Sequence, residues 1–389
     1  MTVRLGVERV LAGEVPGLGS QRLGLIHHPA SVTSELRPSG LELIARGFDV
    51  CTLFGPQHGA LGEKQDNMVE SAHFQDPVTG LPSYSLYGDV RKPTPDMLSG
   101  LDAVLFDLQD VGVRVYTFVW TMALAMEACA EAGVRFVVLD RPNPIGGVLR
   151  EGPTLRPGYE SFVGLHPVPL RHGLTCGELA RWLKRERAIA CELEVVACEG
   201  WERRMRWQET GLPWVMPSPN LPTLDSCAAY AGMVLLEGTN LSEGRGTTRP
   251  FELFGAPFVQ AGLLAEALEP LLGPGVVLRP CYFEPTFQKH AGVTCGGGQL
   301  HVTDSDAFCP VHTAVAILCA ARAVAPADFG WREPPYEYET EKAPIDVLWG
   351  HAGLRLGVDR SSTPRDILNE TLEELDAFEA SVQPDLLYA

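Results

Sequence analysis

Residues 103–140 read AVLFDLQDVGVRVYTFVWTMALAMEACAEAGVRFVVLD, and this stretch decides the fold. Its two ends, 103–108 and 135–139, are short apolar runs of the kind that form buried strands. Between them, the pattern of residues 117–132 predicts a long helix, which stops at Gly133 because glycine commonly terminates helices. A strand, a helix and a second strand in this order predict a crossover between parallel strands of one sheet.

The same alternation continues on both sides of this stretch. Strands are predicted at 22–26 and 48–54, with a helix at 38–47 between them. Further along the chain, a helix at about 175–187 precedes a strand at 192–196. Repeated crossovers of this length are typical of the α/β class. We therefore predict a Rossmann-like, doubly wound parallel sheet.

A proline-rich segment at residues 213–222 ends the alternating pattern, and we place a domain boundary there. The first domain is predicted to span 1–222 and to carry most of the site loops. Residues 223–389 mix strand and helix patterns, so they are expected to form a smaller α+β domain. Its helices are predicted at about 257–269, 311–324 and 363–380, and its strands near 276–283 and 299–303.

Composition limits the classes of partner. The chain has 389 residues and a formal net charge of −18, which argues against nucleic acid because phosphate binding needs a basic surface. No apolar stretch reaches membrane-spanning length, and the first thirty residues contain no signal-peptide apolar core. The ten cysteines include no C-x-x-C pair. We expect a cytoplasmic protein without membrane or nucleic-acid partners, and the sequence does not indicate the oligomeric state.

Motifs for common cofactors are absent from the sequence. There is no phosphate-binding G-x-x-x-x-G-K-[ST] loop, and Gly244-Arg-Gly246 lacks the third glycine of a dinucleotide fingerprint. There is no H-E-x-x-H, and the neighbouring His27 and His28 end a predicted strand, where adjacent side chains point to opposite faces. The sequence therefore predicts no cofactor and no metal.

Polar loops follow three of the predicted strands, at 55–59, 109–112 and 140–144. In a parallel sheet such loops lie at one edge, where ligands bind. The most polar loop of the second domain, EGTNLSEGRGT at 237–247, contains three glycines, which allow a backbone to approach a ligand closely. We predict one composite cleft where these loops meet. It would bring together His58, Asp110, Asn143 and Glu243.

Long motifs occur in these loops and elsewhere along the chain. They are LFGPQHG at 53–59, TGLP at 79–82, YSLYG at 84–88, FDLQDVGVRVYT at 106–117, LDRPNP at 139–144, PSPN at 217–220 and YEYE at 336–339. With the 237–247 loop, they resemble the NamZ-type exo-β-N-acetylmuramidases, the former domain of unknown function 1343 and now glycoside hydrolase family 171. The resemblance implies a Rossmann-like larger domain, a smaller second domain and a cleft between them. It also implies release of N-acetylmuramic acid, a small carbohydrate, from the non-reducing end of peptidoglycan fragments.

One position departs from the family pattern. The resemblance implies Gly-Pro-Glu-His-Gly, with the glutamate as the favoured catalytic carboxylate, whereas this chain has Gln57. A carboxamide cannot act as a general acid or base at neutral pH. The following segment introduces Glu63 and Asp66, so the acid is predicted to have moved to one of them. The alternatives are a non-catalytic sugar-binding protein and a hydrolase that cleaves another bond in the same cleft.

Two further residues are candidates for catalysis. His58 follows Gln57 directly, and its alternative role is that of a turn histidine that binds backbone carbonyls. Tyr116 lies where the resemblance implies an active-site tyrosine. Asp107 is instead expected to be a buried carboxylate that pairs with Arg114.

The remaining polar residues are candidates for binding the sugar. Arg141 could bind the lactyl carboxylate of muramic acid with two hydrogen bonds. Glu243 and Arg245 could close the cleft over the sugar, and their alternative role is a salt bridge between the domains. The complete set of predicted binding residues is Gln57, Asp110, Arg114, Asp140, Arg141, Asn143, Asn220, Asn240, Glu243 and Arg245.

Overall fold

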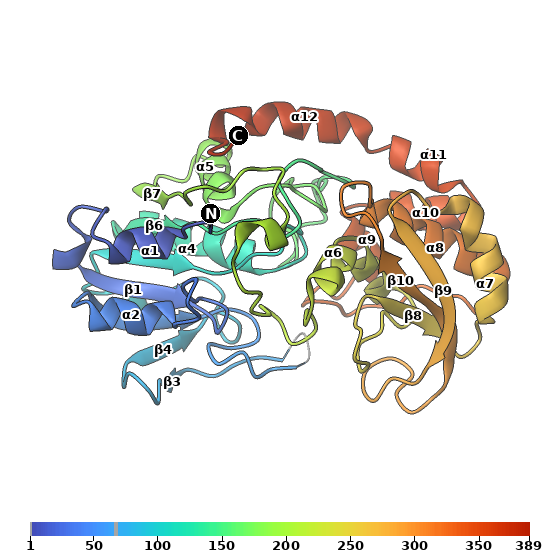
Figure 1. Cartoon of the computed structure of the whole chain (residues 1–389), viewed down its shortest axis with the longest axis horizontal. Helices are drawn as coiled ribbons and strands as arrows, with labels where there is room; N and C mark the ends of the chain where they lie inside the picture. The colour runs from blue at the N-terminus through green and yellow to red at the C-terminus, as the bar shows by residue number, and fades with distance from the viewer. Residues whose placement is uncertain (1, 66–68) are drawn as a thin grey trace.

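The computed structural model describes residues 2–65 and 69–389, and it contains two separate sheets (Figure 1). The larger sheet has the strand order β3-β4-β2-β1-β5-β6-β7, in which β3 is antiparallel to β4 and the other neighbours are parallel. Its strands are β1 (Arg22–His27), β2 (Asp49–Gly55), β3 (Phe74–Gln75), β4 (Pro82–Ser85), β5 (Ala103–Asp107), β6 (Arg135–Leu139) and β7 (Leu193–Val196).

Helices cover both faces of this sheet. They are α1 (Gly6–Leu11), α2 (Ser39–Ala45), α3 (Pro95–Leu98), α4 (Phe118–Ala132) and α5 (Cys176–Glu186). Strand β5 shows the alternation, because Val104 and Phe106 belong to the apolar cluster that includes α4, whereas Leu105 belongs to a second cluster with Val7 of α1 and Leu43 of α2. Apolar side chains on both faces are expected of a parallel sheet that helices cover on both sides. The predicted doubly wound α/β fold is confirmed.

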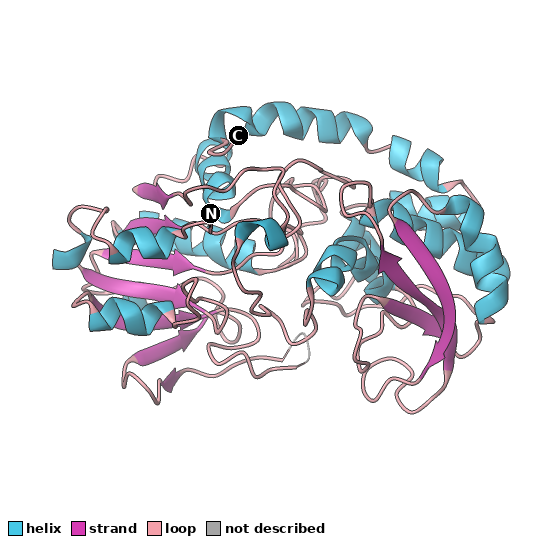
Figure 2. Cartoon of the chain, viewed as in Figure 1, coloured by secondary structure: helices cyan, strands magenta, loops and turns pink. Residues whose placement is uncertain are grey.

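The second half of the chain builds a smaller antiparallel sheet with the order β8-β10-β9. Its strands are β8 (Leu253–Ala256), β9 (Val276–Phe283) and β10 (Cys295–Val302). The helices of this half of the chain are α6 (Leu224–Met233), α7 (Ala261–Leu268), α8 (Pro310–Val324), α9 (Pro344–Trp349), α10 (Gly353–Asp359), α11 (Pro364–Asn369) and α12 (Leu372–Val382). Figure 2 shows that loops fill much of the space between the two sheets. Among the described residues, no helix has the length and apolar character that a membrane crossing requires.

Close packing between α6 and α8 depends on Gly232. Gly232 of α6 lies against the start of α8, where a Cβ atom at position 232 would come within 1.9 Å of the Pro310 carbonyl oxygen. No side chain fits at that distance, so the two helices approach closely because residue 232 has none.

The single terminal helix predicted over 363–380 is wrong, because the structure has two helices there, α11 and α12. The hydroxyl of Thr371 donates to the carbonyl oxygen of Leu368 at 2.8 Å. This local bond competes with the helical pattern, which explains the break.

After this break the chain returns to the larger domain, and α12 crosses towards α5 (Figure 1). Trp182 of α5 packs edge-on against Phe378, and its indole nitrogen donates to the Ser381 hydroxyl at 3.0 Å. The hydroxyl of Tyr388 donates to Asp140 at 2.6 Å, just beyond the end of β6. Residues 372–389 therefore pack with the larger domain, although the sequence assigned them to the smaller one.

Candidate active site

A pocket lies where loops of the larger domain meet the smaller domain. Strands β2 and β5 lie on either side of β1, and the loops that follow their carboxyl ends line one side of the pocket. This is the position where an open α/β sheet binds its ligands. The polar residues that line the pocket are Gln57, His58, Tyr116, Ser218, Tyr230, Glu237, Arg245, Tyr336 and Glu337.

The loop after β2 brings Gln57 and His58 into the pocket. His58 has a φ of 72° and Gly59 a φ of 79°, so the backbone turns sharply through the left-handed region. The Nδ1 atom of His58 lies 2.8 Å from the carbonyl oxygen of Lys64, which can only accept, so Nδ1 carries the proton. Burial lowers the pKa of His58 to about 4, and the ring is therefore neutral at neutral pH.

A chain of hydrogen bonds runs from Gln57 to a buried carboxyl group. Thr117 donates to Gln57 Oε1 at 2.7 Å, and Gln57 Nε2 donates to the hydroxyl oxygen of Tyr87 at 3.2 Å. Tyr87 in turn donates to Glu337 Oε2 at 2.9 Å. The amide that replaces the expected carboxylate is thus connected through Tyr87 to a carboxyl group from the other half of the chain.

Glu337 sits on a strained turn. Glu337 has a φ of 45° and Tyr338 a φ of 70°, two consecutive left-handed residues that are not glycine. The turn is closed by backbone hydrogen bonds of 2.9 Å in both directions between Tyr336 and Glu339. Strain of this kind is often retained at functional sites, and here it places a carboxyl group in the pocket.

The environment of Glu337 changes its acidity. The pKa of Glu337 is raised to about 7, chiefly by burial and also by the negative charge of Glu237, while the hydrogen bond from Tyr87 acts in the opposite direction. The group therefore exchanges its proton close to neutral pH.

The other buried carboxylates of the pocket region are ion-paired. Arg245 donates to Glu237 at 2.6 Å, and Tyr336 donates to the second oxygen of Glu237 at 2.8 Å. Glu243 lies 2.9 Å from the Lys289 ammonium and 3.4 Å from Arg245 Nε. Although burial alone would raise the pKa of Glu243, these two cations hold it below its usual value. Glu237 and Glu243 thus balance buried cations.

Four residues predicted from the sequence line this pocket, namely Gln57, His58, Tyr116 and Arg245. The hydroxyl of Tyr116 donates to the carbonyl oxygen of Pro217 at 2.6 Å, which ties it to the proline-rich segment. Of the four loops expected to form one cleft, the first therefore contributes His58 itself, and the fourth contributes Arg245 beside Glu243.

Asp110 and Asn143, from the other two loops, hold the sheet edge together and do not line the pocket. Asp110 accepts a hydrogen bond from the Gly112 amide at 2.7 Å and lies 3.3 Å from the His172 ring. Asn143 donates to the carbonyl oxygen of Leu174 at 3.0 Å. Both side chains shape the loops that support the site.

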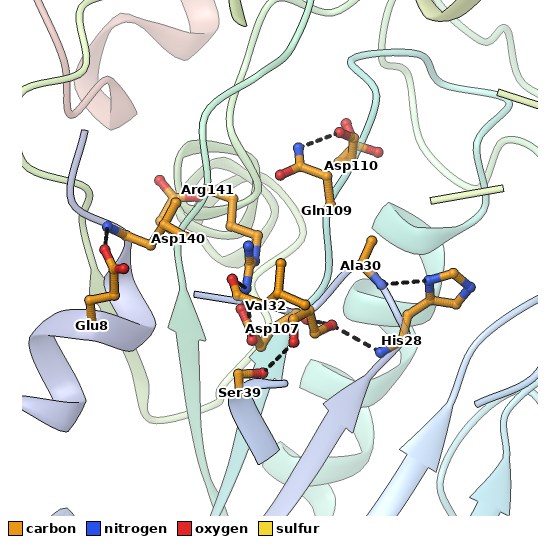
Figure 3. A network of polar contacts seen from close by, with 12 residues as sticks. Glu8, His28, Ala30, Val32, Ser39, Asp107, Gln109, Asp110, Asp140 and Arg141 are labelled. Carbon is orange, nitrogen blue, oxygen red and sulfur yellow. Dashed lines mark hydrogen bonds and ion pairs between the residues drawn. The ribbon is translucent and has the colours of Figure 1, made fainter. Parts of the chain in front are cut away.

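Arg141 forms an ion pair with Asp107, for which the sequence analysis predicted Arg114 as the partner. Its guanidinium contacts both oxygens of Asp107, at 2.7 and 3.0 Å, and the carbonyl oxygen of Val32 at 2.9 Å (Figure 3). The expected pair between Asp107 and Arg114 is wrong, because Asp107 ends β5 and Arg141 follows β6, its neighbour in the sheet. The two guanidinium nitrogens that could bind a substrate carboxylate are thus already bonded to Asp107.

Arg114 is completely buried and binds backbone instead. It donates to the carbonyl oxygens of Pro153 at 2.7 Å, Val168 at 2.9 Å and Leu348 at 2.8 Å. Leu348 belongs to α9 of the smaller domain, so this arginine ties the two domains together.

Asp140 and the two asparagines also have structural partners. Asp140 accepts from the Thr175 hydroxyl at 2.7 Å and from Tyr388. Asn240 donates to the carbonyl oxygen of Asp328 at 2.7 Å, inside the smaller domain. Asn220 donates to the backbone of Gln65 at 2.8 Å and thereby fixes the loop after β2 beside the pocket.

The migrated acid expected at residues 63 or 66 is not found in the pocket among the described residues. Half of the Glu63 side chain is exposed, and its carboxylate lies 3.3 Å from the Lys64 ammonium. Glu63 is therefore not the desolvated acid that was predicted at one of these two positions. Asp66 lies outside the described residues.

Sequence reasoning missed Tyr87, Tyr336 and Glu337 as site residues. Tyr87 and Glu337 touch across 250 positions of sequence, so no local spacing could indicate their contact. The sequence signals for these residues are the YSLYG and YEYE motifs at 84–88 and 336–339. Among the described residues, no group of three or more histidine, cysteine, aspartate or glutamate side chains is placed to hold a metal.

Comparisons relate the whole chain to one group of proteins. Residues 23–225 match the family model described as "Exo-beta-N-acetylmuramidase NamZ, N-terminal", and residues 228–388 match "Exo-beta-N-acetylmuramidase NamZ, C-terminal". The chain is 43% identical over 388 residues to the "Peptidoglycan beta-N-acetylmuramidase NamZ" of Bacillus subtilis (strain 168), which covers 99% of this chain and 91% of that protein.

Two solved structures share the fold. A DUF1343 family protein from Bacteroides fragilis NCTC 9343 superposes with a TM-score of 0.91 at 34% identity, covering 100% of this chain and 99% of the other. A second DUF1343 family protein from the same strain gives a TM-score of 0.78 at 25% identity, with the same coverage. The likeness extends over both sheets and the segment between them.

Proposed function

Since this chain belongs to the NamZ family of exo-β-N-acetylmuramidases, it is an exo-acting glycosidase of peptidoglycan fragments, and we propose that the pocket around Glu337 and Arg245 is where it releases N-acetylmuramic acid. The observation that carries this placement is the convergence of polar groups from both domains in one pocket beyond the carboxyl edge of the sheet.

Arg245 is suited to recognise the acidic part of the sugar. N-acetylmuramic acid differs from other N-acetylhexosamines by its lactyl carboxylate, and arginine binds carboxylates with strong, directed hydrogen bonds. Within the described residues, the Nη1 atom of Arg245 is buried without a hydrogen-bond partner. A buried donor of this kind is costly unless a ligand satisfies it.

A turnover assay tests the proposed function. Purified protein is incubated with a chromogenic N-acetylmuramide and, in parallel, with the N-acetylglucosaminide of the same leaving group. We expect colour release from the muramide and little from the glucosaminide, which lacks the lactyl group. Disaccharide fragments should release N-acetylmuramic acid only when it occupies the non-reducing end. Absence of turnover on every muramide substrate would refute the proposal.

A second candidate function rests on Gln57. The amide at the expected position of the catalytic carboxylate favours a protein that binds the sugar without cleaving it. Calorimetric titration with muramyl disaccharide separates the two functions, since a binding protein would show saturable heat and an intact ligand after the experiment.

We also propose a cytoplasmic location and a division into domains near residue 222. All ten cysteines are free thiols, which supports a reducing compartment. The boundary is supported by the proline-rich segment that connects the two sheets, and limited proteolysis followed by mass spectrometry would test it.

A further inference from the structure

The pocket contains two carboxyl groups with different partners. Glu237 accepts from the Arg245 guanidinium at 2.6 Å and so forms a buried ion pair. Glu337 accepts at 2.9 Å from the neutral hydroxyl of Tyr87. Of the two, Glu237 is therefore bound to a cation, whereas Tyr87, which binds Glu337, is neutral.

The direction of the hydrogen-bond chain assigns a role to Gln57. Its oxygen accepts from Thr117, so its nitrogen faces Tyr87 and donates to the hydroxyl oxygen. Tyr87 has a single hydrogen, which it gives to Glu337 Oε2. A carboxylate at position 57 would instead compete for that hydrogen. The amide thus commits the hydrogen of Tyr87 to Glu337.

We propose that Glu337 is the general acid of this chain, with Tyr87 and Gln57 as its positioning residues. The inference rests on the proposed function. In the reaction, Glu337 gives its proton to the glycosidic oxygen while the bond from that oxygen to the anomeric carbon breaks and its electron pair stays on the oxygen. The leaving sugar departs as an alcohol. Water then bonds to the anomeric carbon, and the proton that it loses returns to Glu337, directly or through solvent.

The charges around Glu337 agree with this role. Burial is the largest cause that raises the pKa of Glu337, to about 7, and Glu237 adds to it. Tyr87, Arg245 and Arg91 act in the opposite direction. A general acid works best when its pKa lies near the working pH.

The decisive experiment compares two substrates in the full-length protein. One is a muramyl disaccharide, whose sugar leaving group needs a proton, and the other is a 2,4-dinitrophenyl N-acetylmuramide, whose leaving group departs without one. We expect Glu337→Gln to lower kcat/KM for the disaccharide by about 10²- to 10⁴-fold, and to lower it far less for the aryl glycoside. The activity of the wild type should fall as pH rises through the pKa of the acid, and the activity of the variant should not.

Glu339→Gln is the matched control. Glu339 lies on the same turn but pairs with Lys342 at 2.7 Å, so its amide should leave both rates and the profile unchanged. An equal loss on both substrates in Glu337→Gln, or no loss, would overturn the assignment of the acid while the proposed function stands. A wild type inactive on both substrates would remove the proposed function and this inference together.

Tyr87→Phe supplies an independent variant in case Glu337→Gln does not fold. Removal of the hydroxyl takes away a hydrogen bond that lowers the pKa of Glu337. The fall in activity should then move to higher pH, with a lower kcat and an unchanged KM. If the fall in activity stays at the wild-type pH, Tyr87 does not act on the acidity of Glu337. A tyrosine with a purely structural role would give that result.

Discussion

Arg245 illustrates how one side chain can serve both the fold and the ligand. One guanidinium nitrogen binds Glu237, and Nε faces Glu243 at 3.4 Å. Its charged plane lies 5.1 Å from the centre of the Phe251 ring. The two carboxylates are the leading causes that raise the pKa of Arg245 above its usual value, against the effect of burial. The arginine is therefore permanently charged where the lactyl carboxylate is proposed to bind.

Replacement of Arg245 by lysine keeps that charge and removes the planar fork. We expect KM for a chromogenic N-acetylmuramide to rise roughly 10- to 100-fold, as loss of a charge-assisted hydrogen bond of about 1.5–3 kcal/mol implies. The residual rate on the N-acetylglucosaminide should not change. Steady-state kinetics on both substrates check this, and a KM unaffected by the lysine would exclude Arg245 as the carboxylate ligand.

Glu63, in contrast to Arg245, is expected to have no role in binding or catalysis. Its side chain is half exposed, and its carboxylate pairs with the neighbouring Lys64. Surface pairs of this kind contribute little, so Glu63→Gln should leave kcat and KM within about twofold of the wild type. A large loss of turnover in this variant would restore the hypothesis that the acid moved along its own loop.

At the scale of elements, local patterns predicted most of the larger sheet. Strand β5 and helix α4 follow from residues 103–108 and 117–132, because apolar runs and helical periodicity are encoded by neighbouring residues. Gly133 ends α4 with a φ of 67°, as its sequence position indicated. The break at Thr371 escaped prediction, since a side chain bonding to a backbone carbonyl leaves the apolar pattern unchanged.

The site was predicted less completely than the sheet. Loop residues such as His58 and Arg245 stand out in sequence because polar side chains cluster around them. Arg141 and Asp107 come together only through the pairing of β5 with β6, and Glu337 reaches Tyr87 only through the packing of two domains. Contacts between distant segments depend on the tertiary fold, which periodicity does not encode.

The contact between α6 and α8 supports a prediction on stability. Gly232→Ala places a methyl group 1.9 Å from the Pro310 carbonyl oxygen, so the helices must separate. We expect the free energy of unfolding to fall by about 3 kcal/mol or more. Gly262→Ala in α7 is the control, because its Cβ would meet no atom within 4 Å, and alanine should stabilise that helix by about 0.5–1 kcal/mol. Urea denaturation measures both, and equal effects would contradict the packing argument.

At the scale of the whole molecule, Tyr388 joins the end of the described chain to the central sheet. Burial raises the pKa of Asp140 to about 6, above its usual value, so its neutral form is favoured in the folded state. The stability that this gives is complete at low pH and is lost as pH rises through 6. Above that pH the charged carboxylate relies on the Tyr388 hydroxyl for a charge-assisted bond.

Tyr388→Phe should therefore destabilise the protein more at pH 8 than at pH 5. We expect a loss of roughly 1.5–3 kcal/mol at pH 8 and roughly 0.5–1.5 kcal/mol at pH 5, from the strengths of charged and neutral hydrogen bonds. Urea denaturation at the two pH values measures the difference. Tyr282→Phe, at an exposed tyrosine, is the control and should cost nothing at either pH. A loss independent of pH would show that Asp140 does not sense the hydroxyl.

The return of α12 to α5 also has a consequence for biosynthesis. A ribosome delivers the strands of the parallel sheet first, yet Trp182 and Asp140 acquire Phe378 and Tyr388 as neighbours only roughly 200 to 250 residues later. One flank of the nascent larger domain therefore stays uncovered while the smaller domain is translated. Chaperones that protect unfinished chains would meet that flank, and a premature stop codon near the end of the message would damage the part of the protein made first.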